Sequence, residues 1–177
     1  MEQGVTRLIE LFDGLFAESY NTRLVAGKGE PIYLPADEQT PYNRVVFAHG
    51  YFASVMHEVA HWCVAGAERR LLEDFGYWYR PDGRTSAQQA EFEQVEVKPQ
   101  AMEWIFTLAS KRKFYASADN LSGDERDDSH FRFAVSKQAR HYMREGLPER
   151  AAVWTQALYN EFAGELEIAS LRWPDEL

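Results

Sequence analysis

The chain has 177 residues, of which 45% are hydrophobic and 14% aromatic, and its formal net charge is −9 at pH 7. This length and composition are typical of a globular protein, and we expect residues 1–177 to form a single domain. With only one basic cluster, at 111–114, the sequence argues against direct nucleic-acid binding. The acidic balance either keeps the protein soluble or attracts a basic substrate, and charge alone does not separate these alternatives.

The sequence carries no signal for secretion or membrane insertion. Cys63 is the only cysteine, so no internal disulfide can form. The start of the chain, MEQGVTRLIELFDGLF, lacks the basic region, the apolar core and the cleavage site of a signal peptide. No apolar run is long enough for a transmembrane helix. We therefore expect a cytoplasmic protein with no membrane partner.

The first half of the chain mixes helical and β-type patterns. In order, it predicts a helix at 2–18, strands at Ile32–Leu34 and 44–48, and a helix at 53–65. Apolar residues at helical spacing define the first helix, and prolines and glycines punctuate the two strands. Gly66 can cap the second helix, and the segment 67–76 can add one or two helical turns.

The second half is mainly helical. It predicts helices at 87–110, 130–145 and 149–163. A strand at 77–80 precedes them, and Ser86 with Gln89 forms a capping box for the first. Pro99 should break or kink that helix, because proline cannot donate a backbone hydrogen bond. The polar stretch 116–130 is predicted to be a surface loop. Early strands among several helices indicate an α+β fold.

The stretch FASVMHEVAHWC contains His57, Glu58 and His61 in the pattern H-E-x-x-H. On a helix, residues four apart differ by only about 40° around the axis, so both imidazoles can reach one metal ion. Most of the surrounding residues are apolar, and buried imidazoles need a metal or hydrogen-bonding partners. A metal site is favoured, and a hydrogen-bonded structural pair is the alternative. Cys63 lies on the opposite face, where we expect a packed core residue.

A catalytic metal site needs a third protein ligand and an open position. The next predicted helix offers four acidic residues, Glu91, Glu93, Glu96 and Glu103. Glu96 is favoured, because a charged residue between Val95 and Val97 is flanked by apolar neighbours. Glu93 is the alternative, because Pro99 makes the phase of this helix uncertain.

Local spacing leaves the metal and the chemistry open. His49 stands at the end of the second predicted strand. It either supports a metal ligand, contacts the substrate, or is simply structural. Zinc would polarise a water molecule with Glu58 as general base, as in a metallopeptidase. Fe(II) uses the same set of two histidines and one carboxylate and leaves positions open for O₂. Spacing alone favours zinc, because H-E-x-x-H on a helix is the hydrolase arrangement.

Longer runs carry a more specific resemblance. In order, they are EPIYLPAD, PYNRVVFAHGYFAS, HEVAHWCVAG, DFGYWYRPDGR and FEQVEVKPQAMEW. Together they resemble the bacterial elongation factor P hydroxylase family. The similarity is strong over about residues 5–125 and weaker over the last 50 or so. Runs of this length are far more specific than the five-residue motif.

The resemblance implies oxygen-dependent hydroxylation of the elongation factor P lysine that already carries a β-lysyl group. It implies a protein-lysine hydroxylase of the non-haem iron monooxygenase type, with Fe(II) held by His57, His61 and most plausibly Glu96, and with O₂ as co-substrate. Glu58 would then orient a ligand or hold a substrate ammonium. The strongly cationic target agrees with the acidic chain. The implied fold is a small α+β one, similar to a bacterial metal-dependent endoribonuclease.

Other functions remain as alternatives at this stage. A zinc metallopeptidase of the HExxH type is the strongest, because Glu58 could serve it as base. A non-catalytic module with a structural metal is the next. A metal-dependent ribonuclease rests on the fold analogy alone, and the lack of a basic face weighs against it.

Overall fold

The computed structural model describes residues 1–74, 86–115, 129–164, 166–167 and 171. The helices in these residues are α1 (Val5–Phe16), α2 (Phe52–Val64), α3 (Ser86–Ala109), α4 (Ser129–Glu145), α5 (Glu149–Phe162) and the short 3₁₀ turn η1 (Arg69–Leu71). The strands are β1 (Thr22–Ala26), β2 (Ile32–Leu34) and β3 (Asn43–Phe47). The predicted α+β class is confirmed. None of the described helices is both long and apolar enough to cross a membrane.

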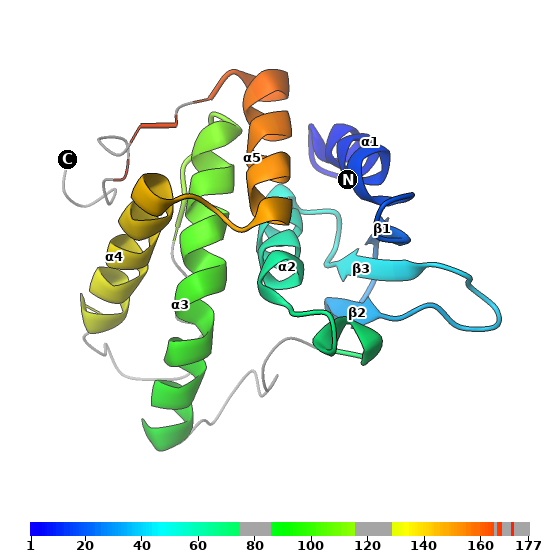
Figure 1. Ribbon diagram of the computed structural model, residues 1–177, viewed down its shortest axis with the longest axis horizontal. Coiled ribbons are helices and arrows are strands. Elements are labelled where there is room, and N and C mark those ends of the chain that lie inside the picture. The colour runs from blue at the N-terminus through cyan, green and yellow to red at the C-terminus, as the bar shows by residue number, and fades with distance from the viewer. Residues whose placement is uncertain (75–85, 116–128, 165, 168–170, 172–177) are drawn as a thin grey trace.

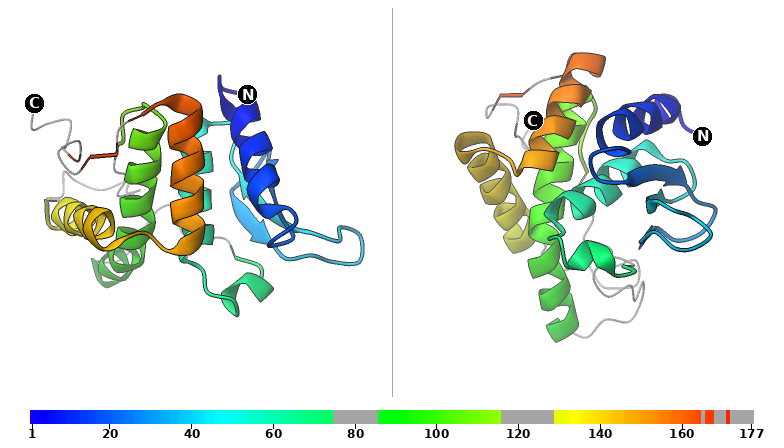
Figure 2. Two further views of the ribbon diagram at one scale, coloured as in Figure 1. Left: turned by 45° about the horizontal axis from the view of Figure 1, so that its top comes forward. Right: turned by 45° about the vertical axis from the view of Figure 1, so that its right-hand side comes forward.

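The three strands form one mixed sheet in the order β1-β3-β2. β1 runs parallel to β3, with Leu24 opposite Val45, and β2 runs antiparallel to it. α2 lies between this sheet and α3, while α4 and α5 pack against α3 from other sides (Figures 1 and 2). The helix with the H-E-x-x-H motif is therefore central in the fold.

Aromatic side chains hold α2 against α1 and α5. The ring of Phe12 lies 5.1 Å from that of Trp62 and 5.8 Å from that of Trp154, both edge-on. Phe16 lies 4.9 Å from Trp62. All four side chains are buried, and each such pair contributes about 0.5–1.5 kcal/mol beyond the burial of its area. These contacts fix the rotation of α2 about its own axis.

The N-terminal end of α2 is tied to the start of the chain. The backbone N–H of Phe52 donates to the Glu2 carboxylate at 2.8 Å, and the N–H of Glu2 donates to the Gly50 carbonyl at 2.9 Å. Arg112 pairs with Glu2, and its guanidinium lies 3.7 Å from the centre of the Phe52 ring. A carboxylate at this end of a helix is favourable, because the exposed N–H groups carry partial positive charge.

Two arginines hold the C-terminal end of α2. Arg150 donates to the carbonyls of Ala65 and Cys63 at 2.6 and 3.2 Å, and Arg70 also donates to Ala65 at 2.7 Å. The prediction that Gly66 caps this helix is wrong, because the chain leaves it in an extended conformation at Ala65. The arginines satisfy the last carbonyls in place of a glycine cap.

Most of the other predicted elements are present, with corrections. Strand β1 was not predicted. Pro99 was predicted to break or kink its helix; the break is wrong, because α3 continues through Pro99, and the kink stays a prediction. A proline removes a single backbone hydrogen bond, and the packing of α3 on three other helices outweighs that loss. The strand expected at 77–80, the Ser86–Gln89 side-chain cap and most of the loop 116–130 lie outside the described residues and side chains. The similarity to an endoribonuclease fold stays a prediction.

Candidate metal centre

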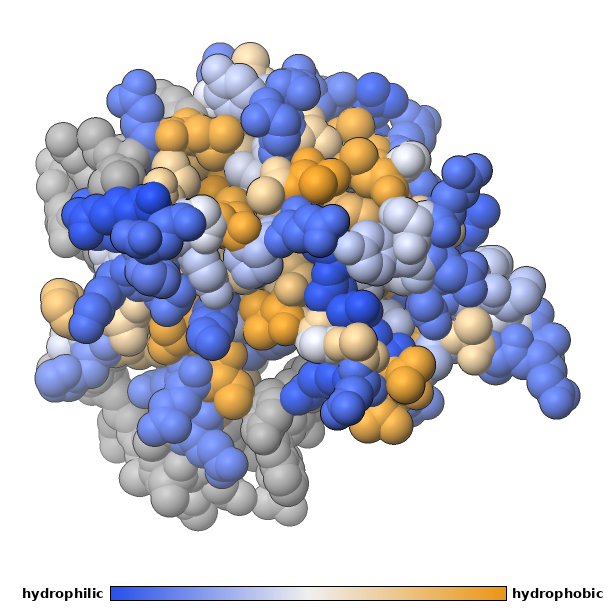
Figure 3. Space-filling model, viewed as in Figure 1, coloured by the Kyte–Doolittle hydropathy of each residue, from blue (hydrophilic) through white to orange (hydrophobic). Residues whose placement is uncertain are grey.

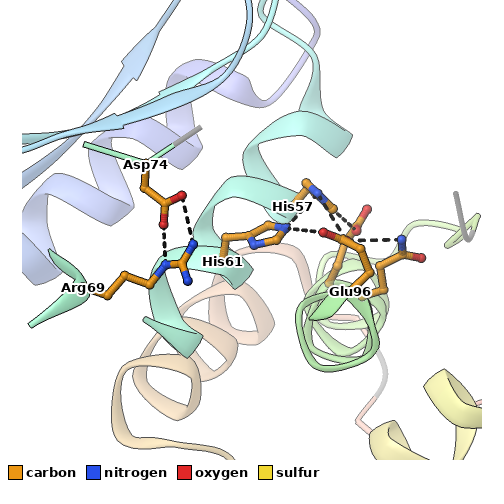
Figure 4. A network of polar contacts seen from close by, with 7 residues as sticks. His57, His61, Arg69, Asp74 and Glu96 are labelled. Carbon is orange, nitrogen blue, oxygen red and sulfur yellow. Dashed lines mark hydrogen bonds and ion pairs between the residues drawn. The ribbon is translucent and has the colours of Figure 1, made fainter. Parts of the chain in front are cut away.

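Two antiparallel helices bring histidines and carboxylates together (Figure 4). His57 and His61 are one turn apart on α2, and Glu96 and Glu103 are about two turns apart on α3. His61 faces Glu96 and His57 faces Glu103, so the pairs run in opposite directions along the two helices. The arrangement follows from the local spacing of each helix and from the register in which the two helices pack.

Three side chains converge on one point. Nε2 of His61 lies 3.1 Å from Oε1 of Glu96, and Nε2 of His57 lies 3.7 Å from Oε2 of the same carboxylate. The two Nε2 atoms are 3.1 Å apart. Metal–ligand bonds of about 2.0–2.2 Å allow donor atoms this close to share one ion. His57, His61 and Glu96 could therefore hold a metal ion.

Both carboxylates of this cluster are buried. Glu96 is 3% exposed and Glu103 is 9% exposed. Glu103 lies 2.8 Å from Nδ1 of His57, and the Gln100 amide donates to Glu96 at 3.5 Å. Burying a carboxylate is costly unless it is paired, so these contacts account for the placement of both acids in the interior.

The site is electrostatically coupled without a metal. Burial lowers the pKa of His57, but the carboxylates of Glu103 and Glu96 outweigh burial and raise it to about 10. Burial raises the pKa of Glu96, but His61 and His57 outweigh burial and hold it at about 2. The metal-free site thus keeps positive charge next to its carboxylates. An incoming cation would replace a proton there, because a ligating imidazole must be neutral.

A cavity of about 400 Å³ adjoins the cluster. His61 and Glu58 line it from α2, and the apolar side chains of Val64, Val95 and Pro99 form part of its wall. This volume is in the range of small-ligand sites. The site therefore combines ligating groups with space for part of a substrate.

The edge of this cavity carries charged and apolar groups. Arg69 donates to both oxygens of Asp74, at 2.5 and 3.1 Å (Figure 4). Leu71 and Leu72 are 75% and 64% exposed at and just after η1. Figure 3 shows hydrophobic atoms gathered over this segment at the lower right. These two exposed leucines thus follow directly after Arg70, which lines the cavity.

Comparison with known proteins identifies the family. Residues 11–171 match the family described as elongation factor P hydroxylase. A protein of Haemophilus influenzae named elongation factor P lysine hydroxylase is 51% identical over 168 residues, which cover 95% of this chain and 94% of that protein. The chain belongs to the elongation factor P hydroxylase family. The predicted family and the predicted enzyme class, a hydroxylase, are confirmed.

The structure separates the candidate residues of this hydroxylase. Of the two acids proposed as third ligand, Glu96 lies with the histidines, and Glu93 is not part of that group among the described residues. His49 is exposed ahead of α2, with a left-handed φ of 50°, and its ring lies 5.9 Å from that of Tyr51. Cys63 is buried in the core, as predicted.

Two further acids, Glu58 and Glu103, lie next to the group formed by His57, His61 and Glu96. Glu58 lines the cavity, and its carboxylate has no hydrogen bond to any residue that the structure describes. Burial raises the pKa of Glu58, while the positive charge of the histidines opposes this. We predicted no role for Glu103. The signal was available, because Glu103 stands between Met102 and Trp104, as Glu96 stands between two valines.

Proposed function

We propose that this chain hydroxylates the β-lysyl-modified lysine of elongation factor P at an iron site formed by His57, His61 and Glu96. The family and the printed name of the H. influenzae relative support hydroxylation of elongation factor P. The observation that carries the proposal is the convergence of two imidazole nitrogens and one carboxylate beside a cavity.

The donor set fits Fe(II). Two histidines and one carboxylate form the triad that non-haem iron oxygenases use, and they leave coordination positions open. Fe(II) bound there would supply the activation of O₂ that a C–H hydroxylation needs. Zinc accepts the same ligands but has no redox chemistry, so it does not suit a hydroxylase.

The cavity suits the aliphatic part of a modified lysine. Val64, Val95 and Pro99 give it apolar walls along which methylene groups can lie, and His61 places the metal-binding cluster at its side. Because the substrate is a side chain of another protein, we expect that protein to contact the surface near the cavity, where Leu71 and Leu72 are exposed. Val64, Val95 and Pro99 would orient the target carbon and exclude water around it.

Glu58 would bind substrate and would not act as a base. Its carboxylate lines the same cavity and is free of hydrogen bonds to the described residues, so it can receive an ammonium group of the β-lysyl-lysine. Hydroxylation requires no deprotonated water, whereas a zinc peptidase needs a general base at this position.

The test compares metals, substrates and one variant. Protein purified without O₂ is reconstituted with Fe(II) or zinc and given elongation factor P with or without the β-lysyl group, together with a chemical reductant and O₂. We expect the modified protein to gain one oxygen atom, measured by mass, only with Fe(II) and O₂. Glu58→Gln should keep the metal and raise KM more than it lowers kcat.

Two results would overturn the proposal. The first is anaerobic activity with zinc, seen as peptide cleavage that Glu58→Gln lowers by about 10²–10⁴-fold, the typical contribution of a general base. The second is equal hydroxylation of elongation factor P with and without the β-lysyl group, which would remove the modified lysine as the substrate.

A further inference from the structure

His57 uses its two ring nitrogens for different partners. Nε2 faces the Glu96 carboxylate and Nε2 of His61, whereas Nδ1 lies 2.8 Å from Oε2 of Glu103. A neutral imidazole carries one proton, and Nδ1 is the nitrogen with a carboxylate within hydrogen-bond distance, because Nε2 lies 3.7 Å from Oε2 of Glu96. A proton on Nδ1 leaves the Nε2 lone pair free for a metal.

The position of Glu103 is set by the interior of the fold. Its side chain is 12% exposed, and the flanking Met102 and Trp104 are buried in the core. The hydroxyl of Thr107 donates to the Glu103 backbone carbonyl at 2.7 Å, within a continuous helix. The backbone at Glu103 is therefore held in the interior, and its carboxylate is presented to His57.

We propose that Glu103 is a positioning residue that holds His57 in the Nδ1–H tautomer and aims Nε2 at the metal. This role rests on the proposed metal site. A carboxylate behind a ligating histidine fixes the ring orientation and raises the basicity of the ligating nitrogen. Within the described part of the chain, His61 has no such carboxylate behind it, so the support is specific to His57.

The alternative is that Glu103 only stabilises the packing of α2 on α3. If the pair were purely structural, its loss would lower the free energy of unfolding without changing the metal affinity of the folded protein. Glu103→Ala removes the acceptor, and Glu103→Gln keeps the shape and one acceptor oxygen but loses the charge. Glu91→Ala is the matched control, because Glu91 is exposed on the same helix.

Anaerobic titrations with Fe(II), and with Co(II) as a coloured probe, measure affinity independently of activity. We expect Glu103→Ala to bind both metals about 10–100-fold more weakly, the usual cost of losing such a partner. Glu103→Gln should show a smaller loss, and Glu91→Ala should match the wild type. Should Glu103→Ala fail to fold, as judged by circular dichroism, the isosteric Gln variant carries the test.

Nuclear magnetic resonance of the zinc-loaded protein reads the tautomer directly, because zinc is diamagnetic. With ¹⁵N-labelled histidine, we expect a slowly exchanging Nδ1–H on His57 in the wild type and in Glu91→Ala, and faster exchange of that proton in the Glu103 variants. Wild-type affinity in both folded Glu103 variants, or a proton on Nε2 of His57, would overturn the role of Glu103. A wild type that bound neither metal would instead refute the metal centre, and this role with it.

Discussion

Replacing Arg150 with alanine should lower the free energy of unfolding by about 2–4 kcal/mol. Arg150 donates to the carbonyls of Ala65 and Cys63 at the end of α2, and its guanidinium lies 4.5 Å from the Trp62 ring. A hydrogen bond from a charged group contributes about 1.5–3 kcal/mol, and a cation–π contact about 0.5–2 kcal/mol. The cost of burying the guanidinium, which also lowers the pKa of Arg150, offsets part of this sum.

Urea unfolding curves measure the loss, and thermal melts should follow it at about 2–4 °C per kcal/mol for a chain of this size. Arg150→Lys should be intermediate, because an ammonium keeps the charge but lacks the planar guanidinium face that lies over the Trp62 ring. Arg7→Ala is the control. Arg7 pairs with Glu10 and Glu161 at the surface, where water screens the charges, so its loss should matter much less.

The loss of stability in Arg150→Ala is expected because Arg150 caps α2. Equal stabilities of Arg150→Ala and Arg7→Ala would refute it, since a half-buried cap and an exposed ion pair would then be worth the same. A change in the slope of the urea curves would indicate an altered denatured state instead of a lost cap.

Three further predictions concern the site and its helix. Glu96→Ala should lose the metal and the hydroxylation while Glu93→Ala keeps both; elemental analysis of the purified variants decides, and the reverse pattern would show that Glu93 is the ligand. Burial raises the pKa of the Cys63 thiol to about 12, so a thiol reagent at pH 8 should modify it only after unfolding, and rapid labelling of the native protein would contradict this. The raised pKa of His57, about 10 when folded, stabilises the metal-free protein fully below about pH 6.5, and this contribution is lost as pH rises toward 10. Urea curves across this range should show the decline, and an unchanged decline in His57→Ala would exclude His57 as its cause.

Local periodicity was sufficient for the helices. The buried residues of α1 are those at helical spacing, namely Val5, Leu8, Phe12 and Phe16. Strand β1 was missed, and its pairing partner β3 lies about twenty residues further along the chain. Strand formation depends on such partners more than on local composition. In the structure, Thr22 and Leu24 are buried and Arg23 between them is exposed.

Only the part of the site that lies within one helix could be predicted from local spacing. His57 and His61 share a face of α2 because they are four residues apart, which a helix alone determines. Which acid meets them depends on the register of α3 against α2, and no local pattern encodes that register. Glu96 was found because its neighbours are apolar. The same reasoning, applied to Glu103, would have found the second buried carboxylate.

The tie between Glu2 and α2 has a practical consequence for variants of this protein. The first turn of α2 is held by the second residue of the chain, and His57 lies only five positions beyond Phe52. A substitution of Glu2 would remove this contact and loosen the helix that presents both histidines. Low metal content in such a variant would then reflect a loosened α2 and not the loss of a metal ligand.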